Sequence, residues 1–425
     1  MNNPRDASPS TASKLLPLAV LIPLVVFTEL SAAENLAVDE RTIHGQPSWI
    51  LSTDDVEVAV TRRGGHMAPV TFGRRDGSPI QPYHVSPWQD ENRDDLPAAV
   101  LVPLRGDFFC MPFGGNAAAA GDEQHDPHGE PATGEWRFGS RSRDDDGTER
   151  LSLVLDTTVR PGRVTKELFV VPGEPVVYSR HVIEGFDGRT PIAHHATLAL
   201  PEEERVVIVS TSPFRMGMTC PGVFSDPASG EYQSLASGQP FTDLSRVPSL
   251  FKAPVEVDCS RIPILRGYAD LLAVVADEAE LGGGPAWTVA VNTKDHWAWF
   301  AIRDARMLPT TVFWIENHGR HGIPWLGRNS CLGLEDACAF FAEGLVPSLE
   351  PNALSRQGVR TAIALDAARP TEIRYAQGAV RVPETFGRVQ RIDFSAPGRM
   401  RLVDSGGVSV TVPVRHSFVM EAGTR

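Results

Sequence analysis

Short runs of alternating apolar and polar residues dominate this chain. In residues 56–61 the side chains of Val56, Val58 and Val60 fall on one face of an extended segment, and Glu57 falls on the other. A period of two residues indicates a half-buried strand, because successive strand side chains point to opposite faces. No helical period persists beyond about ten residues. The pattern therefore predicts a protein that is nearly all β.

Turn-forming residues separate the predicted strands at intervals of about ten residues, which is typical of a β-sandwich. We expect one large antiparallel β-sandwich domain over residues 34–370, with long connections in the Pro-, Ser- and Gly-rich region 201–252. Residues 371–425 are expected to form either a last part of the sandwich or a small appended β module. The strands expected in the main domain are 49–52, 56–61, 66–72, 136–138, 150–159, 164–171, 176–184, 192–200, 267–276, 286–292, 297–303, 311–316 and 358–365, and those after it are 389–394, 399–403 and 408–414.

The first 33 residues predict a signal peptide. Lys14 precedes an apolar run over residues 15–27, which is short for a membrane span, and Ser31, Ala32 and Ala33 supply small residues for cleavage. We therefore expect export to the periplasm or the outside of the cell, with no stable membrane insertion after cleavage. The alternatives are an uncleaved anchor and a misplaced start codon.

Composition narrows the function further. A net charge of −13 argues against nucleic acid as a partner, because such binding needs a basic surface. The five cysteines form no Cys-x-x-Cys pair, and one disulfide, such as Cys220–Cys259, is conceivable. No P-loop, Rossmann fingerprint, nucleophile elbow or His-Glu-x-x-His motif is present.

Glu335 is the first candidate for chemistry. It follows the apolar run 331–334, and a carboxylate at the end of a buried strand is costly unless it is hydrogen-bonded or used. The alternative is a strand-end glutamate in solvent or paired with Arg328.

The adjacent pair His194 and His195 lies in the predicted strand 192–200, so the two rings face opposite sides. His194 alternates with Ala196 and Leu198, an apolar set that suits the core, which favours His195 as the residue in a cleft. A histidine and a glutamate can form an acid–base pair near neutral pH. A structural histidine hydrogen-bonded on the sheet is the alternative for either residue.

Other ligand-binding residues come from loops. Asn116 ends a Gly-Gly-Asn turn whose amide groups suit polar ligands, and the eight tryptophans suit sugar rings or the core. A zinc or manganese site is a further alternative. Its candidate ligands are His125, His128, Glu130 and one of His194 or His195.

In their order these motifs resemble the aldose 1-epimerase (galactose mutarotase-like) superfamily, as a divergent member. His128 and Gly129 precede Trp136, which stands eight positions after the histidine, and the resemblance covers residues 49–365. The strand of His194 and His195 resembles the acid-histidine strand, and Gly333-Leu334-Glu335 resembles the base motif. Ala132 stands where the family usually has an arginine.

The resemblance implies a galactose mutarotase-like supersandwich that interconverts sugar anomers without a cofactor or a metal. Glu335 would remove the C1 hydroxyl proton while His195, or His194, protonates the ring oxygen, so that the open aldehyde can rotate and reclose. The ligand would be a small sugar or an oligosaccharide. The residues expected to contact it are His128, Trp136, Asn116, Arg328 and Arg320.

Two other functions stay open. One is a non-catalytic carbohydrate-binding protein on the same fold, and the other is a carbohydrate lyase or hydrolase. The latter needs a second carboxylate or a tyrosine at the site, for which Tyr83 lies in a suitable loop. Contact between Glu335 and His195 would favour the interconversion of anomers over the binding protein. Two carboxyl groups about 5–9 Å apart would favour hydrolysis. The sequence predicts neither a particular sugar nor an oligomeric state.

Overall fold

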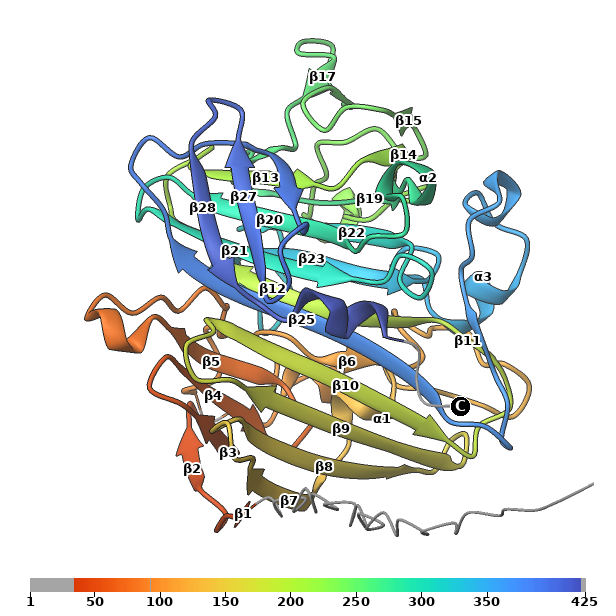
Figure 1. Ribbon diagram of the computed structural model, residues 1–425. Helices are drawn as coiled ribbons and strands as arrows, with labels where there is room; N and C mark the ends of the chain where they lie inside the picture. Colours follow the sequence, from red (N-terminus) through yellow and green to blue (C-terminus); the bar gives the residue numbers. More distant parts are fainter. Residues whose placement is uncertain (1–33, 92, 422–425) are drawn as a thin grey trace, which may run out of the picture. The chain divides into compact units, whose positions relative to one another are not determined.

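The computed structural model describes residues 34–91 and 93–421 (Figure 1). The expected signal peptide, residues 1–33, lies outside the described residues. Within the described part of the chain, no helix is long and apolar enough to cross a membrane.

The described chain is built around two large antiparallel sheets, as the sequence predicts (Figure 1). The ten-stranded sheet has the spatial order β1 (Glu34–Asn35), β7 (Arg137–Arg143), β8 (Glu149–Thr157), β9 (Gly162–Val170), β10 (Val176–Glu184), β25 (Thr371–Arg381), β21 (Trp297–Arg303), β20 (Ala286–Asn292), β13 (Val207–Thr211) and β18 (Arg261–Ile262). The seven-stranded sheet has the order β15 (Pro240–Phe241), β14 (Phe214–Thr219), β19 (Tyr268–Ala276), β22 (Thr310–Asn317), β23 (Ser330–Cys338), β12 (Ile192–Ala199) and β6 (Phe109–Cys110).

Smaller elements complete the fold. The four-stranded sheet is β2 (Glu40–Ile43), β3 (Gln46–Ser52), β4 (Val56–Thr61) and β5 (Met67–Phe72), and the three-stranded sheet is β26 (Val389–Asp393), β27 (Arg399–Asp404) and β28 (Ser409–Pro413). Two-stranded pairs join β11 (Gly188–Thr190) to β24 (Ile363–Leu365) and β16 (Val247–Pro248) to β17 (Glu256–Val257). The helices are α1 (Glu130–Thr133), α2 (Glu278–Leu281) and α3 (Leu345–Leu349), with 3-10 turns η1 (Arg74–Asp76), η2 (Ala99–Leu101), η3 (Pro227–Ser229), η4 (Ser355–Gln357) and η5 (His416–Met420).

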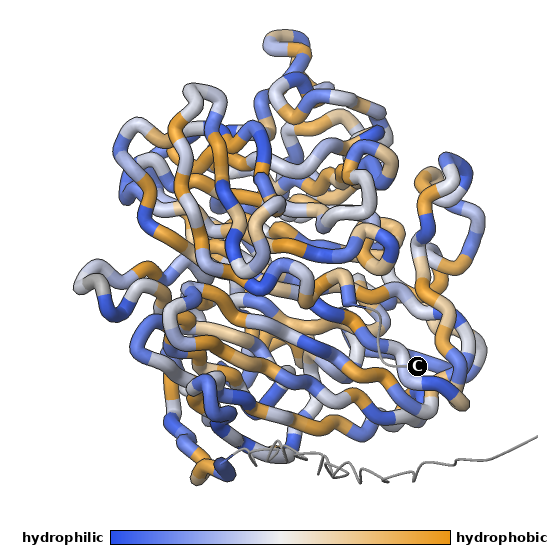
Figure 2. The backbone as a smooth tube through the Cα atoms, in the orientation of Figure 1, coloured by the Kyte–Doolittle hydropathy of each residue, from blue (hydrophilic) through white to orange (hydrophobic). Residues whose placement is uncertain are grey.

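The main core lies between the two large sheets, because alternate residues of their strands are apolar and turn inward. The apolar strand segments stand out along the backbone in Figure 2. Leu334 of β23 and Tyr375 of β25 belong to one buried cluster, which also takes in Val58 of the four-stranded sheet. A buried ion pair crosses this core, with Arg303 Nη1 2.9 Å from Asp336 Oδ1. The antiparallel β-sandwich is thus confirmed.

The C-terminal segment covers the outer face of the ten-stranded sheet. Met400 of β27 and Val412 of β28 pack with Trp287 of β20 and Phe300 of β21 in a second buried cluster. In Figure 1 these blue strands lie over β20 and β21. Strand β25 itself lies between β10 and β21, so residues 371–425 supply both a strand of the large sheet and a separate three-stranded sheet.

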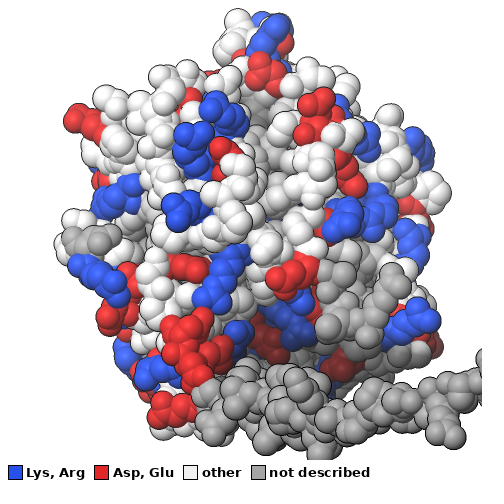
Figure 3. All heavy atoms as spheres, viewed as in Figure 1, with Lys and Arg blue, Asp and Glu red and all other residues white. Residues whose placement is uncertain are grey.

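Several local expectations were wrong. The region 201–252, expected to be connections, contains β13 and β14, which pair with β20 and β19. The last strand expected in the core, 358–365, is only the short β24. All five cysteines are free and buried, so no bridge joins Cys220 to Cys259. Acidic and basic side chains are both spread over the face drawn in Figure 3.

Candidate active site

The site is built on the pairing of β12 with β23. His195 and Glu335 are directly opposite each other in this antiparallel register, and both side chains point to the outer face of the seven-stranded sheet. His195 Nε2 lies 3.2 Å from Glu335 Oε1, and both groups are almost fully buried. Glu335 therefore stands in the middle of a nine-residue strand and not at its end, and the contact brings the two predicted catalytic residues together.

Neighbouring residues leave space for this pair and hold it. Gly333 lies two residues before Glu335 on the same face, and a Cβ there would lie 2.6 Å from Glu335 Oε1. Thr197 Oγ1 is 3.2 Å from His195 Nδ1 and fixes the ring from behind. Phe108 stacks on the His195 ring with centroids 4.5 Å apart. Packing and hydrogen bonding therefore leave His195 little rotational freedom.

His194 faces the other way, into the space between the two sheets. Its Nδ1 lies 3.1 Å from Asp107 Oδ2, and its ring stacks on Tyr375 with centroids 4.1 Å apart. Gln377 donates to the same Asp107 oxygen at 2.9 Å. His194 is therefore part of a buried polar network that holds the two sheets together, away from Glu335.

His128 reaches the site from the loop before α1. Its ring lies edge-on to His195, with centroids 5.0 Å apart. The backbone of His128 has a φ of 66°, and the next residue, Gly129, has a φ of 76°. A Cβ on Gly129 would lie 2.1 Å from the Met111 carbonyl oxygen, so this close approach requires glycine at position 129.

The side chains of His128, His195 and Glu335 line a cavity of about 180 Å³ on the outer face of the seven-stranded sheet. Its polar lining consists of His128, His195, Arg320 and Glu335. Its other walls are the two indoles of Trp314 and Trp325 and the apolar side chains of Val100, Leu101, Leu104, Phe224, Leu271 and Ala342. A small concave site with few polar groups on apolar walls is typical of a ligand pocket.

Burial decides the protonation of the pair. It raises the pKa of Glu335 well above its ordinary 4.5, because no nearby charge offsets the loss of water. It lowers the pKa of His195 well below 6.5, and the ring of His128 adds to this effect. The pKa of His128 itself falls to about 4 through burial. Burial therefore favours the uncharged forms of the two groups, a protonated Glu335 and a neutral His195.

Several buried polar atoms around the cavity have no hydrogen-bond partner among the described residues. These are Glu335 Oε2, Trp314 Nε1, His128 Nδ1 and Arg320 Nε. Buried polar groups are normally paired, and each one left unpaired costs free energy. All four belong to residues that line the cavity.

The two arginines of the β22–β23 loop have different places. Arg320 lines the cavity, with its guanidinium carbon 4.9 Å from the Phe224 ring centre and 5.7 Å from that of Trp325. Arg328 instead pairs with the Glu91 carboxylate, and its Nη2 is 3.0 Å from Glu91 Oε2. It lies outside the cavity lining, and Glu335 has no contact with it.

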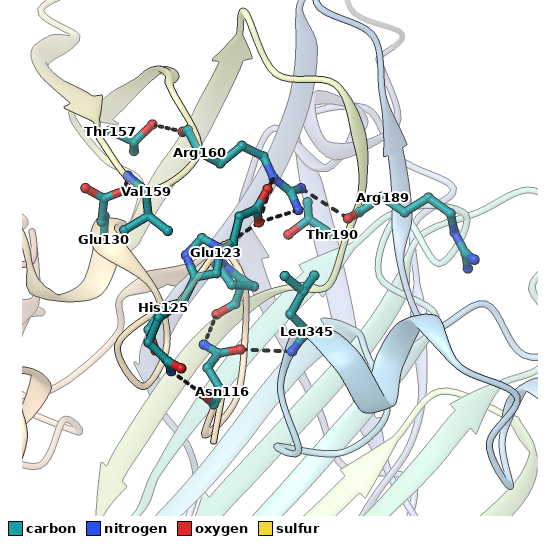
Figure 4. A network of polar contacts seen from close by, with 12 residues as sticks. Asn116, Glu123, His125, Glu130, Thr157, Val159, Arg160, Arg189, Thr190 and Leu345 are labelled. Atoms are coloured by element: carbon teal, nitrogen blue, oxygen red, sulfur yellow. Dashed lines mark hydrogen bonds and ion pairs between the residues drawn. The ribbon is translucent and has the colours of Figure 1, made fainter. Parts of the chain in front are cut away.

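Asn116 lies outside the cavity and connects the backbone segments beside it (Figure 4). Its Nδ2 donates to the carbonyls of Pro112 and Asp126, and its Oδ1 accepts from Leu345 N at 2.9 Å. The same loop is held by Glu123, which pairs with Arg160. Asn116 thus fixes the loop that carries His128 and has no free group to offer a ligand there.

Trp136 is also part of the core. Its indole is buried, and Nε1 donates to the Pro131 carbonyl at 3.0 Å. Ala132, which stands at the expected arginine position, is fully buried in the same apolar cluster as Val100 and Leu101.

The residues considered as metal ligands do not converge. His125 Nε2 lies 3.0 Å from Glu123 Oε2, and the Glu130 carboxylate accepts from the backbone amides of Thr158 and Val159 (Figure 4). His128 and His195 instead line the cavity described above, which neither His125 nor Glu130 lines. Among the described residues, no group of three or more His, Cys, Asp or Glu side chains is arranged to hold a metal ion.

Sequence reasoning missed the aromatic walls. Trp314 lies in β22, which pairs with β23. The alternation of residues in the apolar run 311–315 was the local signal that could have placed its side chain on the same face as Glu335. Trp325 and Phe224 come from irregular loops, where no periodicity indicates which way a side chain points. Tyr83 donates to Gln377 inside the core and does not line the cavity.

Comparison with known proteins supports the fold. No family model matches the chain, and no curated protein matches it significantly. A solved structure from Klebsiella pneumoniae subsp. pneumoniae MGH 78578, provisionally described as an aldose 1-epimerase, is 14% identical with a TM-score of 0.54, covering 81% of this chain and 83% of that one. A galactose mutarotase-like protein from Clostridium acetobutylicum is 11% identical with a TM-score of 0.53, covering 82% of this chain and 99% of that one. The chain therefore has the galactose mutarotase-like fold, as the resemblance implied.

Proposed function

We propose that this protein interconverts the anomers of a small reducing sugar, with Glu335 and His195 as its acid–base pair. The observation that carries the proposal is the 3.2 Å contact between the two buried groups on the wall of a cavity. Such a pair offers one proton donor and one proton acceptor side by side, and the anomeric hydroxyl and the ring oxygen of a sugar are attached to the same carbon.

The reaction needs only a proton that moves within the site. When a cyclic sugar binds, the shared proton passes from Glu335 to His195, which leaves a carboxylate and an imidazolium with no change in total charge. The Glu335 carboxylate takes the proton of the C1 hydroxyl while the C1 to ring-oxygen bond breaks. The ring oxygen receives the proton of His195, and C1 becomes an aldehyde carbon.

The open sugar then rotates about the C1–C2 bond, and the same steps in reverse close the ring on the other face. After opening, Glu335 is protonated and His195 is neutral, which is the arrangement that burial favours. The low polarity of the site therefore stabilises the open-chain state relative to the charged pair. His128 and Trp314 are available to hydrogen-bond sugar hydroxyls, and both proton transfers are carried by side chains.

A hydrolase or lyase receives less support. Glu335 is the only carboxylate among the described residues that line the cavity, and Tyr83 is in the core. The small number of polar groups on the walls favours a non-catalytic sugar-binding protein as the second candidate. We also propose export of the mature protein, as the sequence of residues 1–33 predicts.

The test is anomer exchange measured by saturation-transfer NMR on a panel of aldoses. We expect exchange above the spontaneous rate for at least one sugar and a loss of at least about 100-fold in Glu335→Gln, because a positioned proton-transfer group contributes on this order. Glu40→Gln, an exposed carboxylate paired with Arg62, is the matched control and keeps the rate. Binding of a sugar with no acceleration of exchange would favour the binding protein instead.

A further inference from the structure

Arg320 has an unusual environment for an arginine. Its guanidinium lies against the rings of Phe224 and Trp325, and its terminal nitrogens make no hydrogen bond to any described residue. Its only carboxylate contact is Glu316 Oε2, which lies 3.9 Å from Nε, beyond hydrogen-bonding distance. An arginine normally uses its planar set of donors on a carboxylate or a phosphate. Here the terminal donors have no hydrogen-bond partner among the described residues, and Arg320 lines the cavity.

A continuous aromatic wall connects the catalytic pair to this guanidinium. The ring centre of His195 lies 6.0 Å from that of Trp314, and Trp314 lies 5.7 Å from Trp325. The guanidinium of Arg320 is then 5.7 Å from Trp325. A ligand with its anomeric carbon at His195 and Glu335 would therefore lie along the two indoles and direct its other end towards Arg320.

Charge in the cavity is not balanced by the protein. Burial favours the uncharged forms of His195 and Glu335, whereas Arg320 is permanently cationic. Arg328, the other arginine of the loop, is already neutralised by Glu91. The carboxylate neighbour of Arg320, Glu316 at 3.9 Å, has a pKa that burial raises to about 7, so it offsets the charge of Arg320 only in part near neutral pH. A cation held in this way on largely apolar walls complements a ligand with a single negative charge.

We infer that the substrate of this site is a small reducing sugar that carries one carboxylate, as in a hexuronate, with Arg320 as the group that binds the carboxylate. The inference rests on the proposed function and adds the substrate class to it. A carboxylate matches the fork of one guanidinium, whereas a phosphate dianion would leave a negative charge without a partner in this cavity. Arg320 thereby takes the place of the arginine that is absent at Ala132.

The experiment compares three classes of sugar in the same exchange assay. D-galacturonate and D-glucuronate are the carboxylated probes, D-galactose and D-glucose the neutral ones, and glucose 6-phosphate the phosphorylated one. We expect kcat/KM for one uronate to exceed that for its neutral counterpart by about 10- to 100-fold, the ratio that charge-assisted hydrogen bonds provide. Arg320→Gln is expected to remove that preference through KM, and Arg320→Lys to restore part of it.

Arg328→Gln is the matched control, because it removes a charge from the same loop outside the cavity, and it is expected to keep the uronate preference. Direct binding of each probe is measured by calorimetry in parallel. Equal kcat/KM for uronate and neutral sugar, with both affected alike by Arg320→Gln, would overturn the carboxylate assignment and leave the epimerase function standing. A preference for glucose 6-phosphate that depends on Arg320 would replace the carboxylate with a phosphate.

The two proposals fail separately. Uronate binding that is lost in Arg320→Gln, without exchange of any sugar, would support the anion site and overturn the epimerase function. Absence of binding and of exchange for all three classes would overturn both.

Discussion

At the scale of single residues, the site depends on which of two adjacent histidines faces the cavity. His195 contacts Glu335, whereas His194 contacts Asp107 between the sheets. We expect His195→Asn to lower anomer exchange by at least about 100-fold with little change in stability.

We expect His194→Ala to lower the free energy of unfolding by about 3 kcal/mol, because it removes a partner of a buried carboxylate.

Urea unfolding and the exchange assay on both variants check this difference. A loss of activity in His194→Ala without a loss of stability would contradict the assignment of the two faces, since only a residue at the cavity should act in that way.

The pH dependence of activity follows from the same burial. The pair works while it holds one proton, so activity ends where a second proton binds or where the first is lost. Burial lowers the pKa of His195 well below 6.5 and that of His128 to about 4, so the acid limb of kcat/KM is expected well below pH 6.5. The alkaline limb is expected well above pH 4.5, because burial raises the pKa of Glu335. A pH–rate profile with an acid limb near 6.5 would show a hydrated histidine.

The sequence predicts the catalytic pair because both residues lie in strands. Period-two alternation shows which of His194 and His195 faces outward, and the antiparallel register then brings the outward one to Glu335. No such rule applies to loops. Arg320 and Arg328 both follow a glycine in the β22–β23 loop, and only the path of that loop separates the arginine in the cavity from the one bound to Glu91.

At the scale of elements, the β22–β23 loop is attached through one buried carboxylate. Glu316 Oε1 accepts from the amides of Gly319 and Arg320 at 2.9 and 3.0 Å, and burial raises the pKa of Glu316 to about 7. In the folded protein Glu316 therefore keeps its proton up to about pH 7, whereas in the unfolded chain it loses this proton near pH 4.5. Stability consequently falls as pH rises through this window.

Glu316→Gln keeps an acceptor for the two amides and removes the titration. We expect the variant to have similar stability to the parent at pH 4.5 and to be more stable by about 3 kcal/mol at pH 8, from a pKa difference of this size. The unfolding free energies of the variant and the parent at pH 4.5 and pH 8 test whether the variant gains stability over the parent as pH rises. Equal differences at both values would mean that Glu316 is ionised already at pH 4.5.

The strands missed by the sequence have a physical reason as well. β13 and β14 are short segments inside a region rich in Pro, Ser and Gly, so local composition hides them, while pairing with β20 and β19 stabilises them. β25 carries charged residues along its length, yet its alternate residues Ile373, Tyr375 and Ala379 fill the core. Tertiary contacts with both neighbours, β10 and β21, decide its place.

At the scale of the whole molecule, the three-stranded sheet shares a core with the ten-stranded sheet. Leu402 of β27 is fully buried in that shared cluster. We expect Leu402→Ala to cost about 3 kcal/mol, as a buried leucine truncation does, and to lower the midpoint of one cooperative transition. Differential scanning calorimetry distinguishes this from an independent module, which would unfold in a separate step. Leu250→Ala, at an exposed site, is the control and should leave the transition in place.

The two outer faces of the sandwich have different occupants, and this determines how the protein is best attached to a sensor surface. The cavity opens on the outer face of the seven-stranded sheet, whereas η5 packs on β25 and β21, with Phe418 in the cluster on the outer face of the ten-stranded sheet. The last described residue, Glu421, therefore belongs to the face turned away from the cavity. Immobilisation through a C-terminal tag should leave the pocket open to dissolved sugars, whereas coupling through side chains of the β22–β23 loop would block its entrance.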